Sequence, residues 1–207
     1  GGVLMGTFDG MIGLQSNVDL IDINKTPIES LTTNGLKTSK DQFSFDIIIF
    51  ATGFDAMTGA LTSIDIIGKN GVNLADKWKE GPRSYLGLCI EGFPNMFTIT
   101  GPGSPSVLGN MMVAIEQHVE WIIDCIKHMN ANDKKEIEAE LTAENEWMDL
   151  VEIIASSTLR DTCNSWYVGA NVPGKKRVFM PYAGGYQTYR EKCDEIAKTN
   201  YEGFKIS

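Results

Sequence analysis

The run Asp-Ile-Ile-Ile-Phe-Ala-Thr-Gly at residues 46–53 constrains the fold more than any other stretch of this chain. β-Branched residues favour strands, and an unbroken apolar run is typical of a strand that is covered on both faces. Such strands belong to α/β folds, in which helices pack on a largely parallel sheet. We therefore predict a buried central strand here and an α/β fold class.

The residues before this run carry signals of short antiparallel strands. Residues 18–23 alternate between two faces, and Asn34-Gly35 after residues 29–33 is a β-turn signal. We predict a small β-meander within residues 17–55, which end with the Ala-Thr-Gly strand at a domain linker. Residues 1–16 are rich in glycine and are predicted to be an irregular start, native or not, of a truncated or processed product.

Residues 56–207 are predicted to form one further domain with packed helices. Residues 54–95 predict a long irregular connection, and residues 96–100 a second short buried strand. A helix over about 110–128 follows from apolar residues at helical spacing, namely Met111, Ile115, Val119, Ile122 and Ile126. A second helix, capped by Thr142, follows from the spacing of Trp147, Leu150, Val151 and Ile154. A loop over 161–176, a short strand over 177–182 and a closing helix over 186–198 complete the prediction.

The charge balance and the cysteines exclude several classes of function. Lys and Arg number 18 against 27 Asp and Glu, and the net charge of −9 leaves no basic field for nucleic acid or anionic lipid. The longest apolar stretch is far short of the roughly 20 residues that a membrane helix requires. The four cysteines form no CxxC pair. We expect a cytoplasmic protein with reduced thiols and with neither nucleic acid nor membrane as a partner.

The Gly101-Pro102-Gly103 turn before the first helix allows three uses. It is similar to a dinucleotide-binding fingerprint, but Ser106 stands where the third glycine belongs and prolines lack N–H donors. It can instead be a tight strand-to-helix turn. In the third use, the start of the helix faces a delocalised anion such as a reduced flavin, and residues 106–111 form the wall beside it.

Other polar and aromatic residues give weaker signals. His118 and His128 lie about 80° apart around one helix and about three turns apart, so they cannot share a metal ion. We expect each to be a satisfied histidine, and we predict neither a metal site nor a catalytic dyad. We expect a solvated helix face from the acidic residues Glu138, Glu140, Glu144 and Glu146. Trp166 can stack on a ligand or plug the core. Lys175 and Lys176 nearby can neutralise a phosphate, but a solvated surface loop is favoured.

Taken together, these motifs resemble the C-terminal portion of a Baeyer-Villiger monooxygenase. The resemblance runs in order from about Asn17 to Phe204. It is carried by residues 46–55, 81–88, 93–97, 101–106, 115–121, 165–167, 169–175 and 201–204.

The resemblance implies an FAD- and NADPH-dependent enzyme that uses O2 to insert an oxygen atom next to a ketone carbonyl, giving an ester or lactone. Met111 and Asn110 would lie at the flavin, and Trp166 in the loop that closes over the nicotinamide cofactor. The ketone pocket would be lined by Ser106, Val107, Leu108 and Met111. Residues 56–207 would be the C-terminal part of the FAD-binding domain, with the substrate-pocket loop and the closing loop. The Ala-Thr-Gly end at residue 53 would mark the hinge to the NADPH domain.

The departures from the family pattern limit what this chain is expected to do. Two GxGxxG fingerprints and the monooxygenase signature are absent, and Gly1 and Gly2 stand where the family has a Lys-Arg pair. We therefore assign no catalytic residue to this chain. We expect an inactive C-terminal fragment whose partners are the missing N-terminal nucleotide-binding domains. The alternatives are a non-catalytic binding or assembly module and a flavin monooxygenase that oxygenates nitrogen or sulfur.

Overall fold

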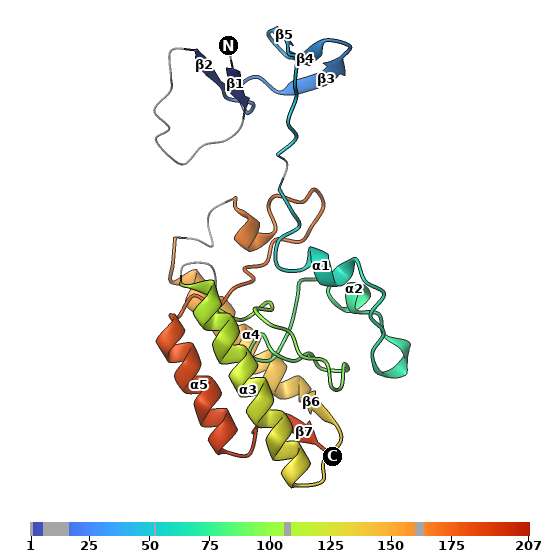
Figure 1. Cartoon of the computed structure of the whole chain (residues 1–207), viewed down its shortest axis with the longest axis vertical. Helices are drawn as coiled ribbons and strands as arrows, with labels where there is room; N and C mark the ends of the chain where they lie inside the picture. Colours follow the sequence, from blue (N-terminus) through green and yellow to red (C-terminus); the bar gives the residue numbers. More distant parts are fainter. Residues whose placement is uncertain (1, 6–16, 52, 106–108, 160–163) are drawn as a thin grey trace. The chain divides into compact units, whose positions relative to one another are not determined.

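The computed structural model describes residues 2–5, 17–51, 53–105, 109–159 and 164–207 (Figure 1). The chain divides into two compact units, one of residues 1–52 and one of residues 53–207. Ser106, Val107 and Leu108, which the resemblance assigns to the ketone pocket, lie outside the described residues.

The first unit contains two small sheets. Strand β1 (Gly2–Met5) pairs in parallel with β2 (Val18–Ile21). Strands β3 (Ile28–Thr32), β4 (Gly35–Thr38) and β5 (Gln42–Ser44) form an antiparallel meander in that order. The meander is confirmed, but the prediction that residues 18–23 take part in antiparallel pairing is wrong, because β2 pairs with a strand from the stretch expected to be irregular.

The predicted central strand over residues 46–53 is wrong, since residues 46–51 form no strand. Ile47 is 78% exposed, Ile49 83% and Phe50 67%. A buried strand needs a hydrogen-bonded neighbour at its edges and helices on its faces. No described residue pairs with this run. Its apolar side chains, which would suit a buried strand, are therefore exposed to solvent.

The second unit is mainly helical, and Figure 1 shows its three long helices gathered together, with the two-stranded sheet at the end where the C-terminus lies. Helices α3 and α5 contact each other, and β6 pairs antiparallel with β7. The elements are α1 (Gly59–Thr62), η1 (Lys69–Gly71), α2 (Leu74–Lys77), α3 (Met111–Ala131), β6 (Ile137–Ala139), α4 (Leu141–Ser156), η2 (Trp166–Val168), α5 (Tyr186–Lys198) and β7 (Phe204–Ile206). None of the helices in the described residues combines the length and apolar character that a membrane crossing requires.

Helix α3 begins where the sequence predicts, because the Asn110 side chain accepts a hydrogen bond from the Met112 N–H at 3.0 Å. Its fully buried line is offset from the predicted apolar stripe. The buried residues are Ala114, Gln117, His118, Trp121, Cys125 and Met129, whereas Ile126 is 43% exposed. The polar tips of His118 and Trp121 find partners inside, so these residues can replace aliphatic ones in the core.

The second helix differs at its start. Helix α4 follows Glu140, so Thr142 lies within the first turn and does not cap it. Trp147 and Val151 are buried as predicted, but Leu150 is 39% exposed. Two glutamates of the expected solvated face are buried instead: Glu144 accepts from the Glu91 N–H at 2.8 Å, and Glu138 from the Gly92 N–H at 2.8 Å. Lysines neutralise both carboxylates, which a buried charge requires.

The predicted strands over residues 96–100 and 177–182 are wrong, because neither segment forms a strand. The Thr98 N–H donates to the Leu88 carbonyl at 2.8 Å, and the Met180 N–H donates to the Tyr167 carbonyl at 2.9 Å. A single bridge joins Pro105 and Tyr182. The backbone of these segments forms isolated hydrogen bonds with irregular segments of the chain. An apolar run alone therefore does not establish a strand.

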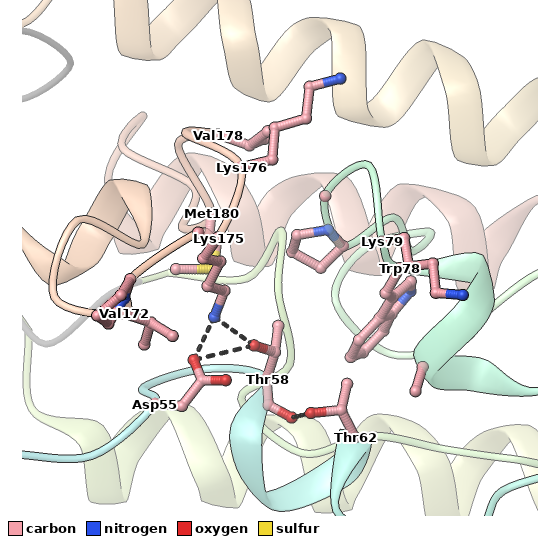
Figure 2. Close-up of a pocket in the computed structure, with 15 residues that line it drawn as sticks. Asp55, Thr58, Thr62, Trp78, Lys79, Val172, Lys175, Lys176, Val178 and Met180 are labelled. Carbon is pink, nitrogen blue, oxygen red and sulfur yellow. Dashed lines mark hydrogen bonds and ion pairs between the residues drawn. The ribbon is translucent and has the colours of Figure 1, made fainter.

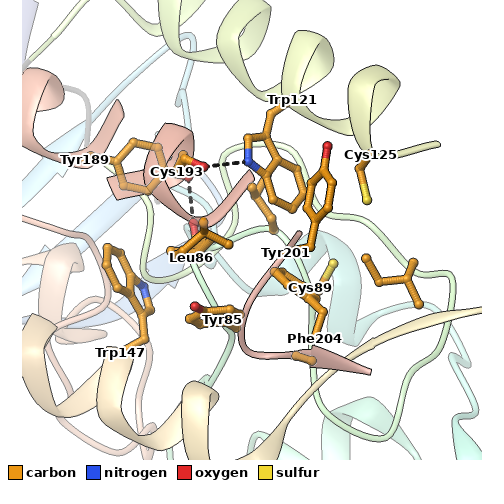
Figure 3. Packing of buried hydrophobic residues seen from close by; sticks show 14 of the residues in the cluster. Tyr85, Leu86, Cys89, Trp121, Cys125, Trp147, Tyr189, Cys193, Tyr201 and Phe204 are labelled. Atoms are coloured by element: carbon orange, nitrogen blue, oxygen red, sulfur yellow. Dashed lines mark hydrogen bonds between the residues drawn. The ribbon is translucent and has the colours of Figure 1, made fainter. Parts of the chain in front are cut away.

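The core of the second unit is rich in aromatic side chains with satisfied polar tips (Figure 3). The Trp121 indole donates to the Cys193 carbonyl at 3.0 Å, and the Trp147 indole donates to the Gly103 carbonyl at 3.0 Å. Leu86 and Leu88 are fully buried beneath the helices, each contributing about 2 kcal/mol of burial free energy. This packing ties α3, α4 and α5 to the turns that precede α3.

Candidate functional site

An open, mostly apolar groove of about 960 Å³ lies at the start of α3. Its walls come from three places: the segment from Phe54 to Leu61, the turn from Phe97 to Gly101, and Met111 at the first position of α3. Phe54 is 90% exposed and Ile99 47% exposed, so large apolar side chains face the open groove. Exposed apolar surface gathered in a concavity is typical of a binding site.

Met111 stands between two hollows. A second, smaller cavity of about 220 Å³ is lined by Asn110, Met111, Tyr182 and Tyr186, among others. Met111 is therefore accessible, not sealed in the core. The first turn of a helix has N–H groups without intrahelical partners and a partial positive charge, and the Asn110 side chain satisfies one of them, that of Met112.

The turn at residues 101–105 is close-packed. A Cβ at Gly101 would lie 2.7 Å from the Gly87 carbonyl oxygen, and Gly103 has φ +87°. The Gly103 N–H donates to the Met180 carbonyl at 2.7 Å, and the Ser104 N–H donates to the Gly101 carbonyl at 3.1 Å. With Pro102 and Pro105 lacking donors, these internal bonds favour a tight strand-to-helix turn over a phosphate cradle in residues 101–105.

His118 lies behind the groove wall and is fully buried. Its Nδ1 accepts from the Thr100 N–H at 2.9 Å, and its Nε2 lies 2.8 Å from the Tyr189 hydroxyl oxygen. Burial lowers the pKa of His118 to about 4, so the ring is neutral at physiological pH. The expectation of a satisfied histidine is confirmed here.

The segment around Trp166 is fastened to the rim of the groove. The Asn171 side chain donates to the Phe54 carbonyl at 2.6 Å. Figure 2 shows the Lys175 ammonium directed at both the Asp55 carboxylate and the Thr58 hydroxyl, the latter 2.6 Å away. Asp55 lines both the groove and a neighbouring cavity of about 350 Å³.

Lys175 corrects one prediction: its side chain is only 19% exposed, so it is not a solvated surface lysine. Lys176 is 53% exposed beside Glu80, as the sequence led us to expect. The difference arises because Asp55, 120 positions away in sequence, supplies the counter-charge that lets Lys175 leave bulk water.

The structure brings together some of the predicted site residues. Met111 and Asn110 lie at the start of α3, whereas Trp166 does not line the groove at Met111. Trp166 instead stacks on Tyr167 with ring centroids 4.1 Å apart. Sequence reasoning did not predict that residues from Phe54 to Leu61 line the groove. The one signal in the sequence that could have indicated them is Asp55, the last residue of the Gly-Phe-Asp motif.

Metal and thiol chemistry find no support in the described residues. They contain no group of three or more His, Cys, Asp or Glu side chains placed to hold a metal ion. Cys89, Cys125 and Cys193 are buried free thiols, as predicted, and burial raises the pKa of Cys125 to about 12. Cys163 lies outside the described residues.

Comparison with known proteins gives a consistent answer, although no family model matches the chain. The chain is 42% identical over 193 residues to cyclohexanone 1,2-monooxygenase from an Acinetobacter species, covering 93% of the chain and 35% of that protein. It is 39% identical over 188 residues to a Baeyer-Villiger monooxygenase from Pseudooceanicola batsensis, covering 90% and 34%. A crystal structure of OTEMO in complex with FAD and NADP superposes with a TM-score of 0.86 at 39% identity, covering 93% and 35%.

The chain is thus similar in sequence and fold to a portion of these monooxygenases. It spans about a third of the length of the curated relatives it matches. Within this class of monooxygenases it is homologous to the Baeyer-Villiger monooxygenases, and the resemblance seen in the sequence motifs is confirmed.

Proposed function

We propose that this chain supplies one wall of the flavin and ketone site in an FAD- and NADPH-dependent Baeyer-Villiger monooxygenase. The whole protein would insert one oxygen atom of O2 next to a ketone carbonyl and release an ester or lactone. The observation that carries the proposal is that Met111 lines an open apolar groove at the start of α3.

The groove suits a flat aromatic ring system. Its volume of about 960 Å³ falls at the upper end of ligand pockets, which span roughly 300–1,000 Å³. Phe54, Leu61, Phe97 and Ile99 offer apolar contact, and the N-terminus of α3 favours negative charge through its dipole. FAD, when bound, supplies the redox and oxygen-activating chemistry.

The chain's own residues would position and shield the reacting groups. Met111 would contact the flavin ring, and Asn110 would hold the first turn of α3 in place by capping Met112. The apolar walls would exclude water. By the resemblance, Ser106, Val107 and Leu108 would continue the ketone pocket, and this assignment stays a prediction.

The remaining parts of the cofactor site would come from outside the chain. The turn at residues 101–105 uses its N–H groups internally, which supports binding of the phosphates of FAD and NADPH by N-terminal nucleotide-binding domains. Trp166 would contact the nicotinamide cofactor from a loop that Asn171 and Lys175 attach to the groove rim. The exposed run at residues 46–51 would pair with strands of those domains, and residues 51–53 would form the hinge to the NADPH domain.

The test compares the 207-residue chain with the product of the complete reading frame. We expect the complete product to purify with FAD and to form the lactone from cyclohexanone with NADPH and O2, whereas the chain alone retains no FAD. A complete product that oxygenates sulfides or amines but no ketone would support the second kind of flavin monooxygenase. A reading frame that begins near Gly1, with no flavin in its product, would favour the binding module.

A matched pair of methionines tests the groove itself. Met111 lines the groove, whereas the neighbouring Met112 side chain is 64% exposed and does not. In the complete enzyme, Met111→Ala should lower kcat/KM for the ketone by about tenfold, because it removes several methylene-sized contacts. Met112→Ala should stay within about twofold of the unaltered enzyme. Equal effects of the two substitutions would contradict the assignment of Met111.

A further inference from the structure

A continuous series of hydrogen bonds, partly buried at Thr100 and fully buried beyond it, crosses the second unit behind the groove. The Thr100 N–H donates to His118 Nδ1 at 2.9 Å, His118 Nε2 lies 2.8 Å from the Tyr189 hydroxyl oxygen, and that hydroxyl donates to the Leu86 carbonyl at 2.7 Å. Figure 3 shows the Tyr189 end of this series beside Leu86 in the aromatic core. His118, Tyr189 and Leu86 are fully buried.

The two backbone groups that end this series of hydrogen bonds determine where the protons of His118 and Tyr189 lie. A backbone N–H can only donate, so Nδ1 of His118 must accept and carry no proton. The proton of the neutral ring is then on Nε2 and points to the Tyr189 oxygen. The Tyr189 proton is left to donate to the Leu86 carbonyl, which can only accept. Each buried polar atom of the series therefore has a partner in a single arrangement.

The backbone is strained at both residues that end this series of hydrogen bonds, Thr100 and Leu86. Thr100 has φ +55° and Leu86 has φ +60°, a left-handed conformation that non-glycine residues rarely adopt. For a β-branched residue such as Thr100 it persists only where the surroundings enforce it. Thr100 lies in the wall of the groove, between Ile99 and Gly101, which also line it. The strain therefore occurs at the proposed ligand site.

We infer that His118, as the Nε2–H tautomer supported by Tyr189, is a positioning residue that holds the strained Thr100 wall of the groove in its binding-competent conformation. The role of His118 in holding the conformation of Thr100 follows from the hydrogen bonds and the backbone strain. The consequence for the ketone rests on the proposed function. His118 does not line the groove, so its effect on a ligand acts through the backbone of Thr100.

The first test needs no substitution and no ligand. The ¹⁵N chemical shifts of the His118 ring in the 207-residue chain should show an unprotonated, hydrogen-bonded Nδ1 and a protonated Nε2. The Thr100 amide should be protected from hydrogen exchange. A protonated Nδ1, or a Thr100 amide that exchanges as fast as an exposed one, would overturn the inference.

Substitutions then separate positioning from filling of the core. His118→Asn places an amide oxygen near the former Nδ1, so Thr100 protection should stay within about threefold. His118→Leu keeps a large apolar side chain but offers no acceptor, so the Thr100 amide should exchange about tenfold faster or more. Tyr189→Phe keeps the ring, removes the hydroxyl, and should give an intermediate increase. Equal Thr100 exchange in the Asn and Leu variants would overturn the inference.

Kinetics of the complete enzyme extend the test to the ligand. His118→Leu should raise KM for cyclohexanone by about tenfold and change kcat by less than about twofold, and His118→Asn should restore most of the KM. Lost Thr100 protection with an unchanged KM would reject the link between the wall and the ketone. If the unaltered complete enzyme oxidises no ketone, the proposed function fails, while the tautomer and exchange measurements still decide the role of His118.

Discussion

The Lys175 ammonium nitrogen lies 2.6 Å from the hydroxyl oxygen of Thr58, the residue that precedes α1. The same ammonium pairs with Asp55, so one lysine joins the loop after η2 to the segment that lines the groove. Residues 117 positions apart in sequence are thus held together by a partly buried ion pair and hydrogen bonds.

This contact predicts that Lys175 controls the opening of the loop. Lys175→Met should increase proteolytic cleavage and hydrogen exchange over residues 164–176 by about fivefold, because the loop loses an attachment of about 1 kcal/mol. Lys176→Met is the control, since its partner Glu80 is 81% exposed, and it should leave both rates unchanged. Equal rates in the Lys175 variant and the unaltered protein would show that the contact does not restrain the loop.

The buried His118 predicts how stability depends on pH. Its pKa of about 4 lies below the unfolded value of 6.5, so the unfolded chain binds the extra proton first as the pH falls. The contribution of His118 to the free energy of unfolding is therefore fully present above about pH 6.5. It is lost between pH 6.5 and 4, by up to about 3 kcal/mol. Urea unfolding at several pH values should show that His118→Asn loses this component. Parallel pH profiles of the variant and the unaltered protein would contradict it.

Two of the three glutamates of α4 provide a stability test with an internal control. Glu144 is fully buried and accepts from the Glu91 N–H, with Lys77 3.4 Å away, whereas Glu146 is exposed. Glu144→Ala should lower the free energy of unfolding by about 3 kcal/mol, because it leaves the Glu91 N–H without its acceptor and removes one of the two carboxylates that pair with Lys77. Glu146→Ala should change it by less than about 0.5 kcal/mol. Similar losses for both variants in denaturant unfolding would refute the distinction.

Val107 carries a prediction that comes from the resemblance alone, since it lies outside the described residues. If it lines the ketone pocket, Val107→Gly in the complete enzyme removes three carbon atoms from the wall. The ratio of kcat/KM for a bulky aryl ketone to that for cyclohexanone should then rise by about tenfold or more. An unchanged ratio in a panel of ketones would remove Val107 from the pocket.

The sequence alone determined those features that depend on neighbouring residues. The start of α3 at Asn110, the extent of α5 and the turn of the meander follow from capping, periodicity and glycine placement, which act over a few positions. The family resemblance was also readable, because its motifs are contiguous strings such as residues 46–55. Met111 was singled out by the same resemblance, and its place at the flavin stays a prediction.

Only the tertiary structure decided which side chains are buried and which are exposed. Ile49 is exposed although its side chain is apolar, whereas Glu144 and Lys175 are charged and yet buried or largely buried. The reason is physical: burying a charge or pairing a strand depends on partners supplied by distant segments, such as Lys77 or Asp55. Local pattern carries no information on whether those partners are present.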